Sequence, residues 1–328
     1  MSNNTSSLFS PCEQSGHLAL HTVISYLYFI LFPIALLLNG VAACVSLHLR
    51  STSTFIVYFK NLVGADLLMT LTAPVMAASH LPDATVKLKV FACRYTDVIF
   101  YCSLYTSIIL MSLISLDRFF KIVRPCGKLL GQSVMFSTVM STSAWFTIFG
   151  TTAIPTMILT NQDPSNNTRD FCMSMKSPLG RSYHDIVILL MEILFWLASI
   201  LIVFCYICIT MKVLESFRNS GSNNSQGKKR TKLRVFCILI VFFLCFVPLH
   251  ALRIPLTLYG IFGISECAQT WLVGIYDLAL WLSTMNACLD PLLYIYLCRE
   301  FRDKLVEMMK GIGICVKLYS VEKEENSP

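Results

Sequence analysis

The chain has 328 residues, of which 55% are hydrophobic and only 14% charged, and its net charge is +7. No soluble protein can hide this much apolar surface from water. The composition therefore excludes a soluble enzyme, a nucleic-acid-binding module, a disordered chain and a secreted disulfide scaffold as descriptions of the whole molecule. We expect an integral membrane protein. In such a protein the distribution of basic residues indicates how the chain is oriented in the membrane, and a positive net charge alone does not indicate a binding partner.

Seven apolar segments follow one another along the chain, and each is long enough to cross about 30 Å of hydrocarbon as a helix. They cover residues 22–49, 55–78, 91–120, 134–159, 186–213, 235–258 and 271–297. Helices are expected because lipid offers no partners to unpaired peptide groups. The sequence thus predicts an all-α, seven-transmembrane helix bundle over residues 22–297. Residues 1–21 would form a glycosylated N-terminus, and residues 298–328 an amphipathic helix and tail.

The Lys and Arg residues between the spans predict the orientation of the chain. About 19 of the 26 lie on the side that holds Arg50, Lys121 and the basic stretch 228–234. The positive-inside rule makes this side cytoplasmic, so the N-terminus would be outside and the C-terminus inside, with the plasma membrane as the expected location. The sequons at Asn3, Asn4 and Asn166 would then face the glycosylating side.

An amphipathic pattern follows the seventh span. Phe301, Leu305, Met308 and Met309 stand at i, i+4, i+7 and i+8, which predicts a short eighth helix lying on the inner leaflet in contact with lipid. Cys315, shortly after it, is either a lipidation site or a free thiol of the tail.

Four of the 14 cysteines fall on the predicted outer side, where disulfides persist. We expect Cys93 at the top of the third span to pair with Cys172, and Cys12 to pair with Cys267. The other ten are expected to be reduced thiols.

A group of polar residues lies near the middle of the predicted membrane. Asp66 is about eleven residues into the second span, roughly 16 Å deep by helical rise. The residues at comparable depth are Asn39, Ser107, Asn286 and Asp290. Two acids with amide and hydroxyl oxygens suit a sodium ion or a shared proton, and the alternative is a purely structural hydrogen-bond network.

Three motifs at fixed positions in the predicted spans narrow the range of membrane-protein families that the chain can resemble. They are Asp-Arg-Phe at 117–119, Cys-Phe-Val-Pro at 245–248 and Asp-Pro-Leu-Leu-Tyr at 290–294. With Leu-Asn-Gly-Val at 38–41, this combination resembles the rhodopsin-like G-protein-coupled receptors over nearly the whole chain. The resemblance implies a receptor without enzymatic activity. Its implied partners are an extracellular small-molecule agonist, a heterotrimeric G protein, arrestin and receptor kinases.

The resemblance also implies a role for several single residues. Arg118 would pair with Asp117 at rest and be released to meet the G protein. Pro248 would kink the sixth span, with Phe246 at the pivot. The remaining implied roles are inward rotation of Tyr206 and Tyr294, and an allosteric sodium ion at the Asp66 cluster that stabilises the inactive form. No other cofactor is expected.

Further segments resemble the purinergic nucleotide receptors, in the branch for ADP and UDP-sugars. They cover residues 53–61, 98–101, 248–255 and 287–291, and the second outer disulfide adds to them. This resemblance implies a nucleotide or nucleotide-sugar agonist and an inhibitory-class G protein. The predicted ligand residues offer positive charge for a phosphate and aromatic faces for a base. They are Lys89, Tyr101, Tyr105, Lys176, His184, His250, Arg253 and Tyr276.

The pattern of this branch is not complete. Tyr276 stands where the branch usually has Lys, and Asp97, Glu192 and Asp277 add three acids to the same cavity. Acids oppose a multiply charged phosphate unless each is neutralised or paired. We therefore also expect a less anionic or zwitterionic ligand, with Arg253 paired to Asp277 at rest.

Other functions remain open alongside this one. A lysophospholipid receptor and a proton-sensing receptor share the fold, and the second would use His184, His250, Glu192 and Asp97. A membrane transporter is the non-receptor alternative, although the chain has no visible internal repeat. An opsin is excluded because the seventh span contains no lysine for a Schiff base.

Overall fold

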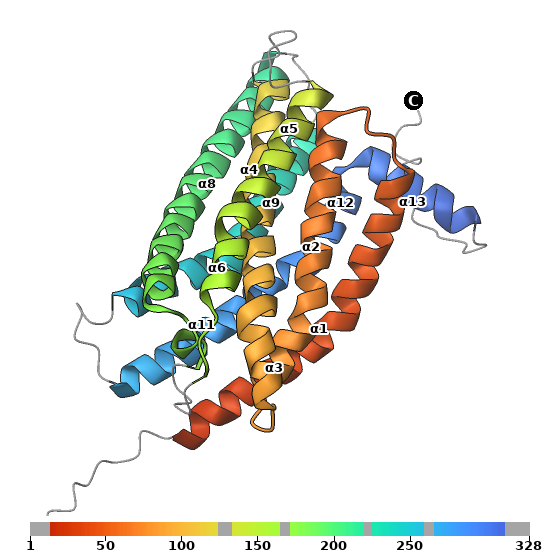
Figure 1. The fold of residues 1–328 in the computed structure, drawn as a ribbon. Coiled ribbons are helices and arrows are strands. Elements are labelled where there is room, and N and C mark those ends of the chain that lie inside the picture. The colour runs from red at the N-terminus through yellow and green to blue at the C-terminus, as the bar shows by residue number, and fades with distance from the viewer. Residues whose placement is uncertain (1–13, 124–132, 165–170, 220–224, 259–265, 312–328) are drawn as a thin grey trace, which may run out of the picture.

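The computed structural model describes residues 14–123, 133–164, 171–219, 225–258 and 266–311. These residues are almost entirely helical, and the only β-structure among them is an isolated bridge between Thr160 and Lys176. Figure 1 shows long helices packed side by side into one elongated bundle. The predicted all-α helix bundle is confirmed.

Six crossings are formed by helices long and apolar enough to span a membrane. They are α1 (Gln14–His48), α2 (Thr54–Ser79), α4 (Asp97–Ile122), α8 (Pro178–Asn219), α9 (Ser225–Thr257) and α11 (Glu266–Thr284). The short α3 (Val86–Phe91) and the π-helical η1 (Ala92–Thr96) lead into α4, and α12 (Asn286–Leu297) continues α11. A four-residue helix, α7 (Phe171–Ser174), precedes α8.

The fourth crossing differs from the single regular helix that the sequence predicts over residues 134–159. It consists of α5 (Val134–Trp145), the π-helical η3 (Phe146–Ala153) and α6 (Ile154–Leu159). Pro155 accounts for part of this irregularity, because it has no amide hydrogen to donate to the Thr151 carbonyl four residues earlier. The Tyr183 hydroxyl of α8 donates to that carbonyl instead.

The amphipathic helix predicted after the seventh span is present as α13 (Arg299–Gly311). It turns away from the bundle axis (Figure 1). Its apolar face is anchored by Phe301, which is 1% exposed and packs against Phe59 of α2 with ring centroids 5.2 Å apart. Leu305 and Met308 pack against the same buried cluster, as their spacing predicts.

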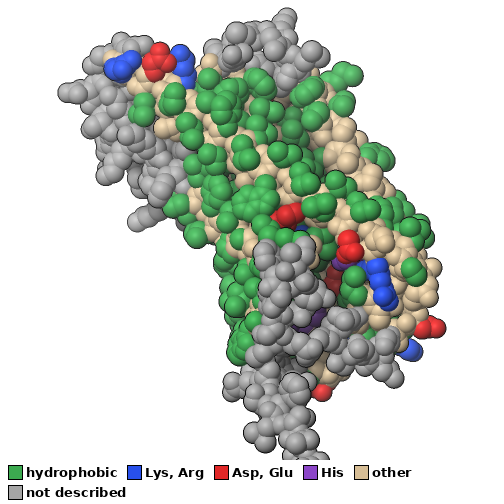
Figure 2. Space-filling view, turned by 90° about the vertical axis from the view of Figure 1, so that its left-hand side faces the viewer, with side chains coloured by type: hydrophobic (Ala, Val, Ile, Leu, Met, Phe, Trp, Pro, Cys, Tyr) green, Lys and Arg blue, Asp and Glu red, His purple; other side chains and the backbone are tan. Residues whose placement is uncertain are grey.

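Hydrophobic side chains cover much of the face of the bundle that Figure 2 shows, and few charged side chains appear on it. Large apolar residues such as Leu47 and Met135 are more than three-quarters exposed. Such a surface is stable only in lipid, where exposed apolar groups do not meet water. The molecule is therefore a multi-pass membrane protein.

The Cys93–Cys172 disulfide is formed as predicted, with Cα atoms 5.4 Å apart. It ties α7 to the start of the third crossing, and we call this end of the bundle the disulfide end and the opposite one the α13 end. The other predicted bridge cannot be followed, because Cys12 and the side chain of Cys267 lie outside the described residues, as do Asn3, Asn4, Asn166 and Cys315.

Replacing Phe59 by alanine tests the packing at the α13 end. Phe59 is 1% exposed and also meets Tyr294 edge-on, with ring centroids 4.5 Å apart. Phe59→Ala should cost about 3–5 kcal/mol, because it leaves a cavity where α2, α12 and α13 meet. The thermal inactivation temperature of purified protein in detergent should fall by several degrees. Phe146→Ala is the control, since Phe146 is 75% exposed; equal losses in the two variants would contradict this packing.

Candidate functional site

Arg253 is the centre of a polar site inside the bundle, toward the disulfide end. Its guanidinium is 9% exposed and donates to the hydroxyl groups of Tyr105 on α4 and Tyr276 on α11, the second at 2.6 Å. The Tyr276 hydroxyl also lies 3.3 Å from that of Tyr101. The three tyrosine rings have centroids 5.4 to 6.0 Å from the guanidinium carbon. We call these four side chains the tyrosine cage.

The expected ion pair between Arg253 and Asp277 is not formed, and that prediction was wrong. Asp277 lies 2.9 Å from Nδ1 of His21 on α1 instead. Among the described residues, no carboxylate comes within 4.0 Å of Arg253. The tyrosine hydroxyls satisfy its hydrogen bonds but carry no charge, so the cation is solvated by protein dipoles and not neutralised. Such a guanidinium is suited to an anionic ligand.

The acid at Glu192 is also partnered, by His250 one turn from Arg253. His250 is 0% exposed, and its Nδ1 lies 3.0 Å from Oε2 of Glu192. Trp196 donates to the other Glu192 oxygen at 3.0 Å. The imidazole stacks on Phe195 with centroids 3.6 Å apart. This network joins α8 to α9 and gives each oxygen of the Glu192 carboxylate a partner inside the bundle.

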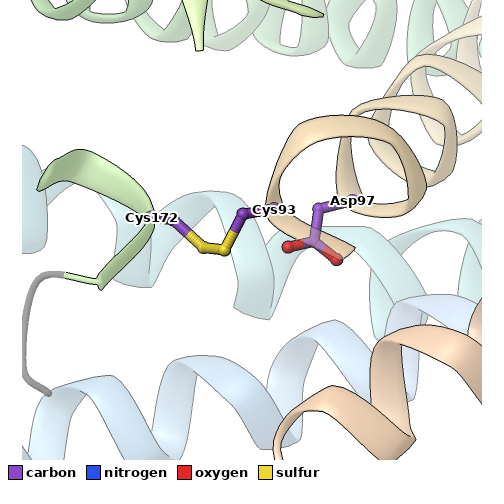
Figure 3. Close-up of side chains that lie close together, drawn as sticks. All are labelled: Cys93, Asp97 and Cys172. Atoms are coloured by element: carbon purple, nitrogen blue, oxygen red, sulfur yellow. A yellow bond between two sulfur atoms is a disulfide. The ribbon is translucent and has the colours of Figure 1, made fainter. Parts of the chain in front are cut away.

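Asp97 is the acid of the three that has no direct partner among the described residues. Its carboxylate lies beside the Cys93–Cys172 disulfide (Figure 3), and its Oδ1 is buried without a hydrogen-bond donor. Two basic side chains act on Asp97 electrostatically from beyond 4.0 Å, first the exposed His80 that follows α2 and then Lys176, which is 6% exposed. Burial lowers the pKa of Lys176, and the Asp97 carboxylate acts in the opposite direction.

The remaining predicted ligand residues lie at different distances from the cage. His184 on α8 is half-buried and within electrostatic range of both Lys176 and Arg253. Lys89 on α3 is half-buried, and none of the described acids pairs with it. The structure thus brings most of the predicted ligand residues toward one another at the disulfide end and leaves Lys89 at the edge.

The polar cluster predicted near the membrane midplane is assembled from four helices. Ser107 donates to Asp66 at 3.0 Å, and Asn286 donates to Asp290 at 2.9 Å. The carboxyl groups of Asp66 and Asp290 lie close enough to interact electrostatically. Asn39 donates to the carbonyls of Ala35 and Ala287 at 3.0 and 2.7 Å.

Three buried oxygens of this cluster have no hydrogen-bond partner in the part of the chain that the structure describes, namely Oδ1 of Asn39, Oδ2 of Asp66 and Oδ1 of Asn286. Unsatisfied buried oxygens are costly and rare. A set of carboxylate, amide and hydroxyl oxygens is the donor chemistry of a small hard cation. These residues therefore fit a sodium ion.

Comparison with known proteins agrees with this arrangement. Residues 39–294 match the family model described as 7 transmembrane receptor (rhodopsin family). The chain is a member of this family.

Several curated receptors are similar to this receptor over most of their length. Human purinoceptor 13 is 38% identical over 86% of this chain and 80% of its own. Bovine purinoceptor 14 is 37% identical over 90% and 88%. Mouse G-protein coupled receptor 87 is 36% identical over 86% and 79%. The resemblance to purinergic-type receptors inferred from the motifs is thereby confirmed. The protein is a receptor and not an enzyme, and it couples to a G protein.

The expected resting pair between Arg118 and Asp117 is absent, so this prediction was wrong as well. Asp117 lies 2.9 Å from Nζ of Lys121, one helical turn away on α4, and accepts from the Thr54 hydroxyl at 2.5 Å. Arg118 lies over the ring of Phe55, with 4.2 Å from its guanidinium carbon to the centroid. Asp117 pairs with Lys121 because residues four apart stand on the same face of a helix, whereas Arg118, the next residue along the chain, starts from a different face.

The other predicted activation residues lie inside the bundle. Phe246 is 0% exposed and contacts Phe242, while Tyr206 and Tyr294 are 7% and 6% exposed. Ser283 of α11 donates at 2.6 Å to the carbonyl of Cys245, three residues before Pro248. This bond ties the kink region of α9 to the neighbouring helix.

Sequence reasoning missed Lys121, Thr54 and His21. The i, i+4 spacing of Asp117 and Lys121 was a usable signal, because it predicts an ion pair on any helix. His21 and Asp277 are far apart in sequence, and nothing in the pattern joins them.

Replacing Lys121 by alanine tests the Asp117 pair. Lys121→Ala should free Asp117 to bind Arg118, and a restrained Arg118 should lower agonist-independent nucleotide exchange on the G protein at least twofold. Exchange in membranes with equal receptor density measures this. Lys212→Ala, which breaks an exposed pair with Glu215, should change nothing. Unchanged or increased exchange in Lys121→Ala would contradict the assignment.

Proposed function

We propose that this receptor responds to an extracellular nucleotide or nucleotide sugar and activates an inhibitory-class G protein at the plasma membrane. The N-terminus and the disulfide end would face outside, with the C-terminus and α13 on the cytoplasmic side. The count of basic residues supports this orientation, since most lie in segments at the α13 end. The two relatives named purinoceptors support a nucleotide-type agonist.

The tyrosine cage carries this proposal. Arg253 is a buried cation without an acidic partner among the described residues, and its fork of donors matches phosphate oxygens. The rings of Tyr101, Tyr105 and Tyr276 supply flat apolar faces beside it. A ligand with an anionic group and an aromatic base has both of the features that these side chains recognise.

Two nearby acids are held by partners other than Arg253. Glu192 is held by His250 and Trp196, and Asp277 by His21. Each carboxylate therefore has a partner within the chain before a ligand arrives, and neither lies within 4.0 Å of Arg253. The zwitterionic alternative assumed three unpaired acids near the ligand. Glu192 and Asp277 have partners, so Asp97 is the acid without one among the described residues.

Several intracellular partners follow from the same proposal. An arrestin and receptor kinases would bind the α13 end after activation. Helix α13 would lie on the inner leaflet, with Phe301 and Val306 buried against the bundle. The basic stretch 228–234 would lie in the third cytoplasmic segment, where it can contact anionic lipid or the G protein.

A ligand panel with Arg253 variants tests the proposed agonist class. In cells expressing the full chain, at least one compound from a panel of nucleoside diphosphates and nucleotide sugars should activate an inhibitory-class G protein. Arg253→Gln should raise the half-maximal concentration at least 100-fold, because it removes a charge-assisted contact in a low-dielectric site. Arg253→Lys should retain part of the response.

Lys87→Gln is the control for this panel, since Lys87 is an exposed cation on α3. A parent that responds to a lysophospholipid or to acid alone, and to no nucleotide, would refute the proposal. An unaltered nucleotide response in Arg253→Gln would do the same.

We propose in addition that the Asp66 cluster binds sodium as an allosteric ligand. Raising NaCl against an equal concentration of N-methylglucamine chloride should lower basal nucleotide exchange in the parent, because the ion stabilises the resting arrangement. Asp66→Asn should abolish the difference between the two salts, since it removes the charge that holds the ion. A sodium response that persists in Asp66→Asn would disprove this site.

A further inference from the structure

Asp97 is the unexplained acid of the ligand site. Its Oδ1 is buried and receives no hydrogen bond, and no Lys, Arg or His nitrogen of the described residues lies within 4.0 Å of its carboxylate. A buried carboxylate oxygen without a donor is costly, and such atoms are few in folded proteins. Because no described residue supplies a donor to this oxygen, the carboxylate is available to a group that arrives from outside the chain.

The position of Asp97 relative to the tyrosine cage follows from helix geometry. Asp97, Tyr101 and Tyr105 stand at i, i+4 and i+8 of α4 and share one face. Asp97 is therefore about 6 Å along the axis from Tyr101, toward the disulfide end. A ligand whose anion rests on Arg253 would bring its next group to the level of Asp97.

Lys176 provides the second half of this position. Its backbone is fixed by the bridge to Thr160 and by the hydrogen bond that its amide donates to the Met173 carbonyl at 3.2 Å. The side chain is buried, and it acts on Asp97 electrostatically without touching it. The stronger electrostatic neighbour of Asp97 is His80, but that side chain is exposed after the end of α2. Asp97 and Lys176 are thus an acceptor and a donor held apart, and we call them the separated pair.

The chemistry of the separated pair selects the ligand group. A second phosphate would be attracted by Lys176 but repelled by Asp97 at close range. An ammonium would meet the opposite conflict. A hydroxyl avoids both, because it donates to the carboxylate and accepts from the ammonium, and adjacent hydroxyls of a sugar can use both groups together.

We propose that the separated pair binds the terminal sugar of a nucleotide sugar, and that Asp97 makes the receptor prefer such a ligand to the corresponding nucleoside diphosphate. This rests on the proposed function, because it requires a phosphate at Arg253. It adds a residue that distinguishes two ligand classes sharing the same phosphate and base.

Matched ligand pairs test the preference. Nucleotide exchange is measured in membranes containing the full-length receptor, with UDP against UDP-glucose and ADP against ADP-glucose. Asp97→Asn keeps the size of the side chain but weakens its acceptor and removes its charge. It should raise the half-maximal concentration of the active sugar conjugate tenfold or more, while that of the plain diphosphate stays the same or falls.

Lys176→Gln should weaken the sugar conjugate in the same selective way. The matched control is Asp83→Asn, which makes the same chemical change at an exposed acid near the disulfide end. Surface labelling of each variant confirms equal amounts of folded receptor.

The outcomes separate this inference from the proposed function. If Asp97→Asn shifts both members of a pair equally, or neither, Asp97 has no role in sugar recognition and the inference is overturned while nucleotide binding stands. If the parent responds to plain diphosphates and not to sugar conjugates, the inference also fails alone. If the parent responds to neither class, both fail.

Discussion

The cost of burying charge in a low-dielectric bundle governs the arrangement of this receptor. Each ionisable side chain inside the helices must find a partner, share a proton or bind an external group, because the lipid around the bundle offers none of these. His250 with Glu192, and Lys121 with Asp117, satisfy this requirement within the chain. The groups that do not are the places where ligands are expected.

Arg253 and Asp97 are the clearest of these groups at the disulfide end, and the Asp66 cluster is their counterpart near the midplane. Arg253 has hydroxyl partners but no counter-charge among the described residues, and Asp97 has a buried oxygen without a donor. The two sites thus lack charges of opposite sign. An anionic group of a ligand would pair with Arg253, and a hydrogen-bond donor would bind the Asp97 carboxylate. A single ligand that carries both groups would therefore give both side chains a partner.

Much of the architecture could be predicted because it depends on local pattern and depth. Seven apolar segments, the Cys93–Cys172 bridge and the gathering of Asp66 with Asp290 all follow from sequence position. The choice of ion-pair partner could not be read in this way. Asp117 had Arg118 and Lys121 as candidates, and Asp277 had Arg253 and His21. Side-chain direction and the competing tyrosines decided each case, and these depend on how the helices pack against one another.

The ligand site and the signalling end are connected through α9. Arg253 and His250 lie on one side of Pro248, and Phe246 lies on the other. His250 fastens the part of α9 near the ligand to α8, and Ser283 fastens the Cys245 carbonyl to α11. A ligand anion that draws Arg253 away from Tyr105 and Tyr276 would change the contacts of α9 with α4 and α11 at once. Because proline leaves the helix without one internal hydrogen bond, bending there costs less than elsewhere. Rearrangement of the tyrosine cage would therefore be coupled to movement of the half of α9 that leads toward the α13 end.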